Sequence, residues 1–244
     1  MLFLPLLERL TGLRAVAVDR PGFGLSDPVE LPRERYRDAG VECLDSVLDA
    51  LGLDETALLG NSTGGTWALW YTLDHPDRVR RLVLVGAPPL LPGTRVPPPL
   101  RVVATPKVGE FLSRKMPSTP RTVVQNMGGM GEKDTIVNYP GQIEAMVAAG
   151  HDPLASRVSL AELRAAISPF GFRPAMKLQR EELRQLTVPT LLIWGEHDPV
   201  GGVEVARATA DTIPGAQLEL LPAGHGPWLG HPDRTAALIA NFVR

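Results

Sequence analysis

The stretch LLGNSTGG, residues 58–65, joins a short apolar run to the helix-like segment TWALWYTL. Gly60 and Gly64 flank Ser62 in the pattern G-x-S-x-G, and glycines allow the backbone to turn tightly there. A serine hydroxyl is a poor nucleophile unless such a turn presents it to a base and frees the next N–H for an oxyanion. The pattern is weak by itself, because a serine that caps the following helix is an equally sound interpretation. The rest of the chain must decide between the two.

Strand and helix patterns alternate on both sides of this stretch. Period-two or continuous apolar runs predict strands at residues 14–18, 56–59, 81–85, 190–194 and 217–221. Spacing of three and four predicts helices at residues 2–10, 35–51, 63–75, 203–213 and 232–243. Such alternation is typical of parallel strands joined by right-handed crossovers. We therefore expect an α/β fold, with a mostly parallel open sheet flanked by helices.

The alternation stops between residues 88 and 185. This segment contains PPLLPG, VPPPL, a GGMG tetrapeptide at 128–131 and several modest helical patterns. No strand precedes GGMG, so it is not a phosphate-binding loop. We expect a core made of residues 1–87 and 186–244 and a helical insertion at 88–185. Met127 and Phe170 could line an apolar pocket in it, although internal packing explains them equally well.

An acid and a base follow the serine in the order expected of a nucleophile-elbow enzyme. Asp198 lies in WGEHDP just after one expected strand, and His225 lies in PAGHGPW just after the next. Residues that follow the carboxyl ends of parallel strands converge on one edge of the sheet. Ser62, Asp198 and His225 all occupy such positions, which favours a nucleophile over a capping serine.

The remaining histidines and tryptophans receive structural interpretations. His75 and His231 each precede Pro-Asp near a helix boundary, which suits surface or capping roles. His197 adjoins the acid but should point elsewhere, and His151 is expected in a polar loop of the insertion. The pair Trp67 and Trp70 falls on the helix after the serine, where core packing is expected.

Composition excludes several classes of function. The 244 residues are 44% hydrophobic and 21% charged, enough for one large core with an insertion. A net charge of −2 without a sustained basic block argues against nucleic-acid or membrane partners. Cys43 is the only cysteine, which fits a reducing compartment. No basic leader and no apolar run of about 18 residues occurs, so we expect a cytoplasmic protein.

Several longer strings resemble the α/β-hydrolase superfamily. They are DRPGFGLSD (19–27), GNSTGG (60–65), HPDRVRRLVLVGAP (75–88), PTLLIWGEHDP (189–199) and AGHGPW (223–228). The resemblance implies Ser62 as nucleophile, His225 as general base and then acid, Asp198 as its orienting partner, and the Thr63 N–H as an oxyanion donor. It also implies that residues 88–185 form a lid. Asn61 and Trp228 are further candidates for contact with the substrate. A small-molecule substrate is expected, with no metal or organic cofactor, and a homo-oligomer stays open.

The chain departs from the family pattern at its beginning. Family members normally begin with further strands, one of which ends in a His-Gly-type loop that donates the second oxyanion N–H. Neither that strand nor the loop is found in the sequence. The family pattern would place the strand between those expected at 14–18 and 56–59. Loss of one oxyanion donor typically lowers turnover by about 10² to 10³.

Three functions are compatible with these patterns. The first is a serine hydrolase that cleaves a small, largely apolar ester or related carbonyl compound through an acyl-enzyme on Ser62. GNSTGG also resembles the GNSxGG turn of carbon–carbon bond hydrolases that act on ring-cleavage products, which is a second interpretation with the same residues. The third is a hydrolase-fold protein that only binds a ligand, because the oxyanion loop is missing.

Overall fold

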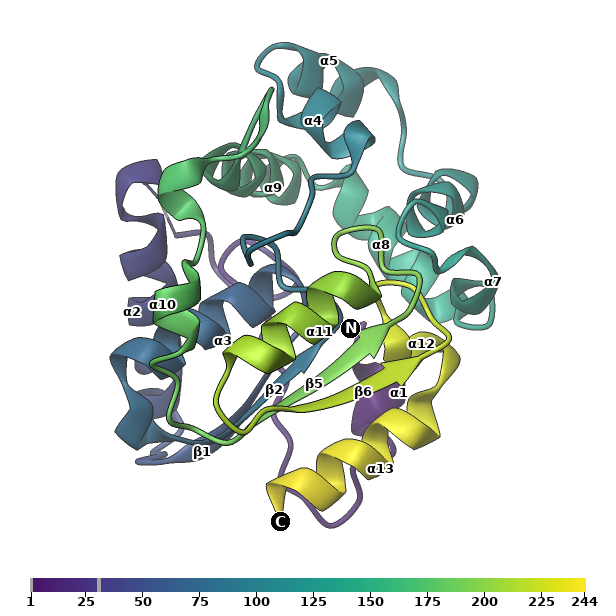
Figure 1. Cartoon of the computed structure of the whole chain (residues 1–244). Coiled ribbons are helices and arrows are strands. Elements are labelled where there is room, and N and C mark those ends of the chain that lie inside the picture. Colours follow the sequence, from purple (N-terminus) through teal and green to yellow (C-terminus); the bar gives the residue numbers. More distant parts are fainter. Residues whose placement is uncertain (1, 30–31) are drawn as a thin grey trace.

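A four-stranded parallel sheet forms the centre of the protein in the computed structural model, which describes residues 2–29 and 32–244. The strands are β1 (Thr56–Gly60), β2 (Val79–Val85), β5 (Thr190–Gly195) and β6 (Gln217–Leu221), in the spatial order β1-β2-β5-β6. All neighbours in this order are parallel, so their carboxyl ends share one edge (Figure 1). This confirms the expected α/β class.

Helices cover both faces of the sheet. One face carries α2 (Tyr36–Ala50), α3 (Thr63–Asp74) and α11 (Val203–Thr212), and the other carries α1 (Leu4–Leu7), α12 (Pro227–Gly230) and α13 (Pro232–Val243). Side chains of β2 alternate between these layers, with Leu82 and Leu84 in the first core and Val83 and Val85 in the second. A parallel sheet needs this double cover because both of its faces are apolar.

Most predicted core elements are confirmed. They comprise the strands expected at 56–59, 81–85, 190–194 and 217–221 and the helices at 35–51, 63–75, 203–213 and 232–243. Trp67 and Trp70 are buried on α3, as expected. The helix expected at 2–10 is shorter than predicted, since α1 covers only Leu4–Leu7. Pro5 lies in its first turn, where a missing N–H is tolerated.

The prediction of a strand at residues 14–18 is wrong. This segment has no regular structure, and Val16 and Val18 are 51% and 48% exposed. A short apolar run becomes a strand only beside a partner that takes its hydrogen bonds. Within residues 2–29 and 32–244, β1 pairs with β2 alone and is an edge strand. No neighbour is therefore described that would organise residues 14–18.

The insertion between β2 and β5 is mainly helical. It holds α4 (Pro98–Ala104), α5 (Val108–Lys115), α6 (Pro120–Gly128), α7 (Lys133–Ile136), α8 (Pro140–His151), α9 (Pro153–Ala166), the hairpin β3 (Ile167–Ser168) and β4 (Gly171–Phe172), the 3-10 turn η3 (Pro174–Met176) and α10 (Arg180–Leu183). Two further 3-10 turns, η1 (Arg33–Arg35) and η2 (Pro76–Arg78), lie outside the insertion, in the part of the chain before residue 88. Figure 1 shows α4, α5 and α9 gathered above the sheet. The division at residues 88 and 185 stays a prediction.

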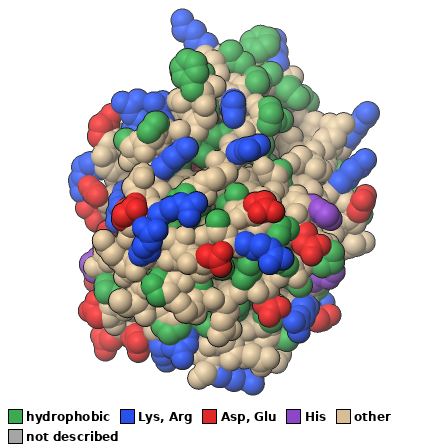
Figure 2. Space-filling view, in the orientation of Figure 1, with side chains coloured by type: hydrophobic (Ala, Val, Ile, Leu, Met, Phe, Trp, Pro, Cys, Tyr) green, Lys and Arg blue, Asp and Glu red, His purple; other side chains and the backbone are tan. Residues whose placement is uncertain are grey.

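Surface charge is mixed in sign. Figure 2 shows Lys, Arg, Asp and Glu side chains interspersed over the face that it displays, in keeping with the net charge of −2. Among the described residues, no helix has both the length and the apolar character that a membrane crossing requires.

The fully buried Leu192 on β5 tests the central position of the sheet. We expect Leu192→Ala to lower the free energy of unfolding by about 2–5 kcal/mol, because it removes buried methyl groups and leaves a cavity. The fully exposed Leu25 is the matched control, and Leu25→Ala should change it by less than about 0.5 kcal/mol. Urea denaturation measures both, and equal values for the two variants would contradict the packing described here.

Candidate active site

Ser62 lies at a strained turn between β1 and α3. Its φ and ψ are 52° and −126°, a conformation that non-glycine residues rarely adopt. Although it occupies the N-cap position of α3, its side chain makes no capping hydrogen bond. The interpretation of Ser62 as a helix cap is therefore wrong. Strain of this kind persists where the surrounding structure enforces it, often at functional sites.

Close packing at Gly60 enforces the turn. A Cβ atom added there would lie 2.5 Å from the Gly64 carbonyl oxygen and 2.6 Å from the Gly65 Cα. A Cβ atom added to Gly64 would meet nothing within 4 Å. Of the two glycines in G-x-S-x-G, the first is thus required by contact with the start of α3, whereas the second is not.

Thr63 is the first residue of α3. Amides in the first turn of a helix have no carbonyl partner inside that helix. The regular bonds of α3 begin further on, where Gly65 N–H and Thr66 N–H donate to the carbonyls of Asn61 and Ser62 at 3.1 and 3.0 Å. The Thr63 amide is therefore in the class of N–H groups that can bind an anion, and its role as an oxyanion donor stays a prediction.

Asp198 and His225 form a buried pair beyond the ends of β5 and β6. The Asp198 Oδ2 lies 2.9 Å from the His225 Nδ1. The same oxygen accepts the Ala87 N–H at 2.8 Å, and Oδ1 accepts the Val200 N–H at 2.9 Å. Both carboxylate oxygens are thus held by the backbone. A carboxylate only accepts hydrogen bonds, so it favours the tautomer of His225 with the proton on Nδ1 and a basic Nε2.

Asn61 supports the loop that carries His225. Its Nδ2 donates to the Val85 carbonyl at 2.7 Å and to the His225 carbonyl at 3.1 Å. The side chain thereby connects the end of β2 to the histidine loop. The sequence placed Asn61 near the substrate, whereas its amide nitrogen is engaged inside the protein.

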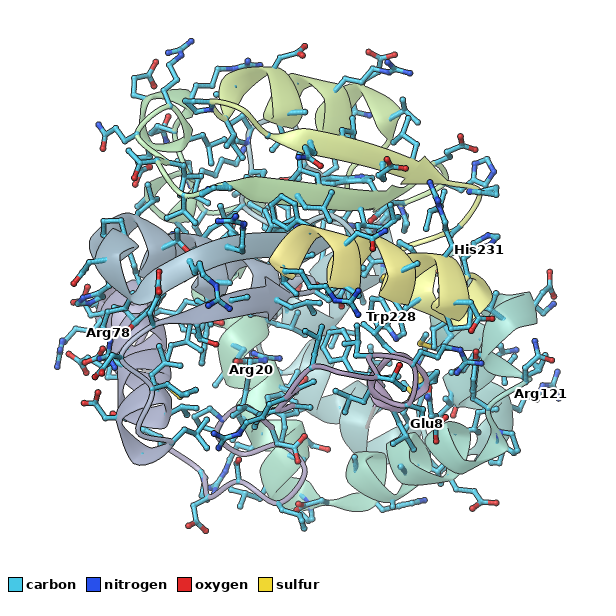
Figure 3. The ribbon with its side chains drawn as sticks, turned by 90° about the horizontal axis from the view of Figure 1, so that it is seen from below. Glu8, Arg20, Arg78, Arg121, Trp228 and His231 are labelled. Carbon is cyan, nitrogen blue, oxygen red and sulfur yellow. The ribbon has the colours of Figure 1, made fainter. Side chains whose placement is uncertain are left out.

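Two of the other predicted substrate contacts lie elsewhere. Trp228 is buried, its indole N–H donates to the Leu2 carbonyl at 2.8 Å, and its ring lies 4.8 Å from that of Phe3. Figure 3 shows it between α1 and α13, so it is a core residue. Phe170 is 95% exposed at the turn between β3 and β4. Met127 is half-buried and packs against the core that contains α1 and α13.

The remaining histidines are distributed around the surface. His197 is exposed, and its backbone N–H donates to the Ala223 carbonyl at 3.0 Å. Its structural role stays a prediction. His75 is the C-cap residue that follows α3, and its ring lies 4.8 Å from that of Tyr71. His231 precedes α13. His151 is exposed at the end of α8, so the expectation that it lies in a loop is wrong.

One polar residue of the site escaped the sequence analysis. Glu132 is only 1% exposed, and its Oε1 accepts the Gly226 N–H at 2.9 Å, next to His225. Burial raises the pKa of the Glu132 carboxyl, while hydrogen bonds from Thr135 and Gly226 act in the opposite direction. No spacing or motif pointed to this residue, because its contact joins positions 94 residues apart.

No metal centre competes with this arrangement in the part of the chain that the structure describes. Among residues 2–29 and 32–244, no group of three or more His, Cys, Asp or Glu side chains could hold a metal ion.

A family model described as alpha/beta hydrolase fold matches residues 3–232. The chain belongs to the α/β-hydrolase family. Its fold and its membership in a family of hydrolases were both expected from the sequence strings, and both are confirmed. Ser62 lies at the carboxyl edge where Asp198 and His225 pair, and its role as the nucleophile stays a prediction.

Several named hydrolases are similar to this chain. It is 30% identical to a 2-hydroxymuconate semialdehyde hydrolase of Pseudomonas putida over 94% of this chain and 76% of that protein. It is 28% identical to a 2-hydroxy-6-oxononadienedioate/2-hydroxy-6-oxononatrienedioate hydrolase of Klebsiella pneumoniae over 98% and 78%. A meta-cleavage product hydrolase from Pseudomonas fluorescens has a similar structure, with a TM-score of 0.74 at 22% identity over 98% and 83% of the two chains. This last similarity shows the fold alone.

Substitution of the two elbow glycines tests the turn. We expect Gly60→Ala to lower the free energy of unfolding by about 3 kcal/mol, because the new methyl group would overlap the start of α3. Gly64→Ala should leave it unchanged or raise it by up to about 1 kcal/mol, since alanine is the better helix former and the space is open. Thermal unfolding of both variants provides the measurement. Equal destabilisation would show that the turn is not held as described.

Proposed function

We propose that this hydrolase cleaves a carbon–carbon bond in a ring-cleavage product of the 2-hydroxymuconate semialdehyde type. The supporting observation is the 30% identity, across most of both chains, to a relative that bears that name. The pairing of His225 with Asp198 and the strained backbone of Ser62 supply groups suited to nucleophilic attack. The similarity to that relative favours the carbon–carbon interpretation over the ester interpretation that the sequence placed first.

The proposed reaction begins when Ser62 Oγ adds to the carbonyl carbon of the substrate and its proton passes to Nε2 of His225. Asp198 stabilises the imidazolium and keeps the ring oriented. The Thr63 N–H donates to the oxyanion, which forms where the helix places its free amide. Collapse breaks the carbon–carbon bond, and the carbon fragment leaves with the electron pair and takes the proton from His225. Water that His225 deprotonates then releases the acid and restores Ser62.

The leaving group distinguishes the two hydrolytic interpretations. An ester expels an alkoxide or alcohol, whereas a carbon fragment leaves only if its electron pair is delocalised, as in a conjugated 2-hydroxy acid. The arrangement of serine, histidine and aspartate serves both reactions. Substrate choice therefore depends on what surrounds the serine, and we propose residues 88–185 as the lid that covers a small-molecule substrate.

Steady-state hydrolysis of a 2-hydroxymuconate semialdehyde-type substrate and of p-nitrophenyl acetate tests the proposal. We expect the native chain to cleave the first with the higher kcat/KM. Ser62→Ala should lower kcat by about 10⁴ to 10⁶ on both substrates, because no nucleophile remains. Ser46→Ala is the matched control, since Ser46 is exposed on α2 and should have no effect.

The outcomes separate the competing functions. Cleavage of the ester alone would overturn the carbon–carbon proposal in favour of an esterase. Turnover that survives Ser62→Ala would overturn the assignment of the nucleophile. A folded native chain that binds the 2-hydroxymuconate semialdehyde-type substrate but cleaves neither compound would favour a ligand-binding protein.

A further inference from the structure

The segment that connects α6 to α7 lies against the loop that carries His225. It contains the end of the GGMG tetrapeptide, Met130 and Gly131, followed by Glu132. Nothing in the proposed reaction uses these residues. They belong to the insertion, about 90 positions before the histidine in the sequence, and yet they accept hydrogen bonds from the backbone of its loop.

Two hydrogen bonds hold consecutive amides of the histidine loop. The His225 N–H donates to the Met130 carbonyl at 2.9 Å, and the Gly226 N–H donates to Glu132 Oε1 at 2.9 Å. Both acceptors come from the insertion, whereas the core holds His225 through its ring and its carbonyl oxygen. The backbone at His225, which sets the direction of its side chain, is thus held both by the insertion and by the core.

Glycines permit the two backbones to approach this closely. A Cβ atom at Gly224 would lie 2.4 Å from the Met130 carbonyl oxygen and 2.7 Å from the Gly131 Cα. Gly131 has a φ of 79°, and a Cβ atom there would lie 2.9 Å from the Gly224 Cα. No side chain fits between the two backbone segments at Gly131 and Gly224. Met130 and Gly131, the last two residues of the GGMG tetrapeptide, therefore support the histidine loop by direct backbone contact.

Glu132 is built to hold its amide partner in place. Its Oε2 accepts the Thr135 hydroxyl while Oε1 accepts the Gly226 N–H, so both oxygens are engaged. The backbone N–H of Glu132 donates to the Met127 carbonyl at 2.8 Å, which ties the residue to the end of α6. A buried carboxylate with fixed partners has little freedom to move, and charge-assisted bonds to backbone amides are among the stronger ones.

We propose that Glu132 is a positioning residue: through the Gly226 N–H it keeps the His225 ring in line with Asp198 and Ser62. This inference rests on the proposed function, since it assigns a role only if His225 is the base. Displacement of a reacting group by about 1 Å can lower a rate by about 10²-fold. Loss of the Glu132 anchor should therefore slow the chemical step without weakening substrate binding.

The test compares kcat and KM of p-nitrophenyl acetate hydrolysis for the native chain, Glu132→Ala and Glu132→Gln, well below the lowest melting temperature. Glu132→Ala should lower kcat by about 10- to 100-fold with KM within about threefold. Glu132→Gln should recover most of kcat, because the amide oxygen can still accept the Gly226 N–H. Rescue by the amide would show that an acceptor at this place is required.

Glu162→Ala is the matched control. Glu162 is also a buried glutamate of the insertion, and on α9 it pairs with Arg20. The control should lower the melting temperature as Glu132→Ala does but leave kcat unchanged.

Three results would overturn the inference. They are a native kcat in Glu132→Ala, a loss confined to KM, or an equal loss of kcat in Glu162→Ala. A native chain that hydrolyses neither p-nitrophenyl acetate nor a 2-hydroxymuconate semialdehyde-type substrate, with Ser62→Ala indistinguishable from it, would overturn the proposed function and the positioning role together. The two failures are therefore distinguishable.

Discussion

The carboxyl ends of four parallel strands meet at one edge of the sheet, and the candidate site depends on that alignment. Pairing runs in register from Gly60 with Leu84, through Val85 with Ile193, to Gly195 with Leu221. The four strands therefore end at one edge, although β5 and β6 extend to Gly195 and Leu221, beyond Leu192 and Leu218, which lie at the level of Gly60. Because the chain leaves every strand there, the segments that carry Ser62, Asp198 and His225 start from one edge although they are far apart in the sequence.

The site combines strain with tight support. Ser62 holds an unfavourable φ, and Asp198 is a buried carboxylate, so each would be unstable in isolation. Close contact at Gly60 enforces the first, and backbone amides of Ala87 and Val200 satisfy the second. The histidine loop is held by Asn61 from the core and by the insertion from the opposite side. Rigid support on all sides suits a site whose chemistry requires fixed distances.

Much of this architecture is readable from the sequence, because strands and amphipathic helices leave periodic patterns and the serine, aspartate and histidine follow strand ends. What escaped depends on contacts that periodicity does not encode. Residues 14–18 have the composition of a strand but no described neighbour to pair with. Phe170 and Trp228 are both aromatic, yet one is solvent-exposed and the other is in the core. Glu132 follows the GGMG tetrapeptide, to which the sequence assigned no function, and only the folded chain brings it to Gly226.

The proposed mechanism requires that the pair His225 and Asp198 activates Ser62. Incubation with a fluorophosphonate, followed by digestion and mass spectrometry of the peptides, tests this most directly, since the reagent bonds only to a serine with a working base. The account predicts a single adduct on Ser62, abolished by His225→Ala and strongly slowed by Asp198→Asn. No adduct on a folded chain, or an adduct on another serine, would contradict it.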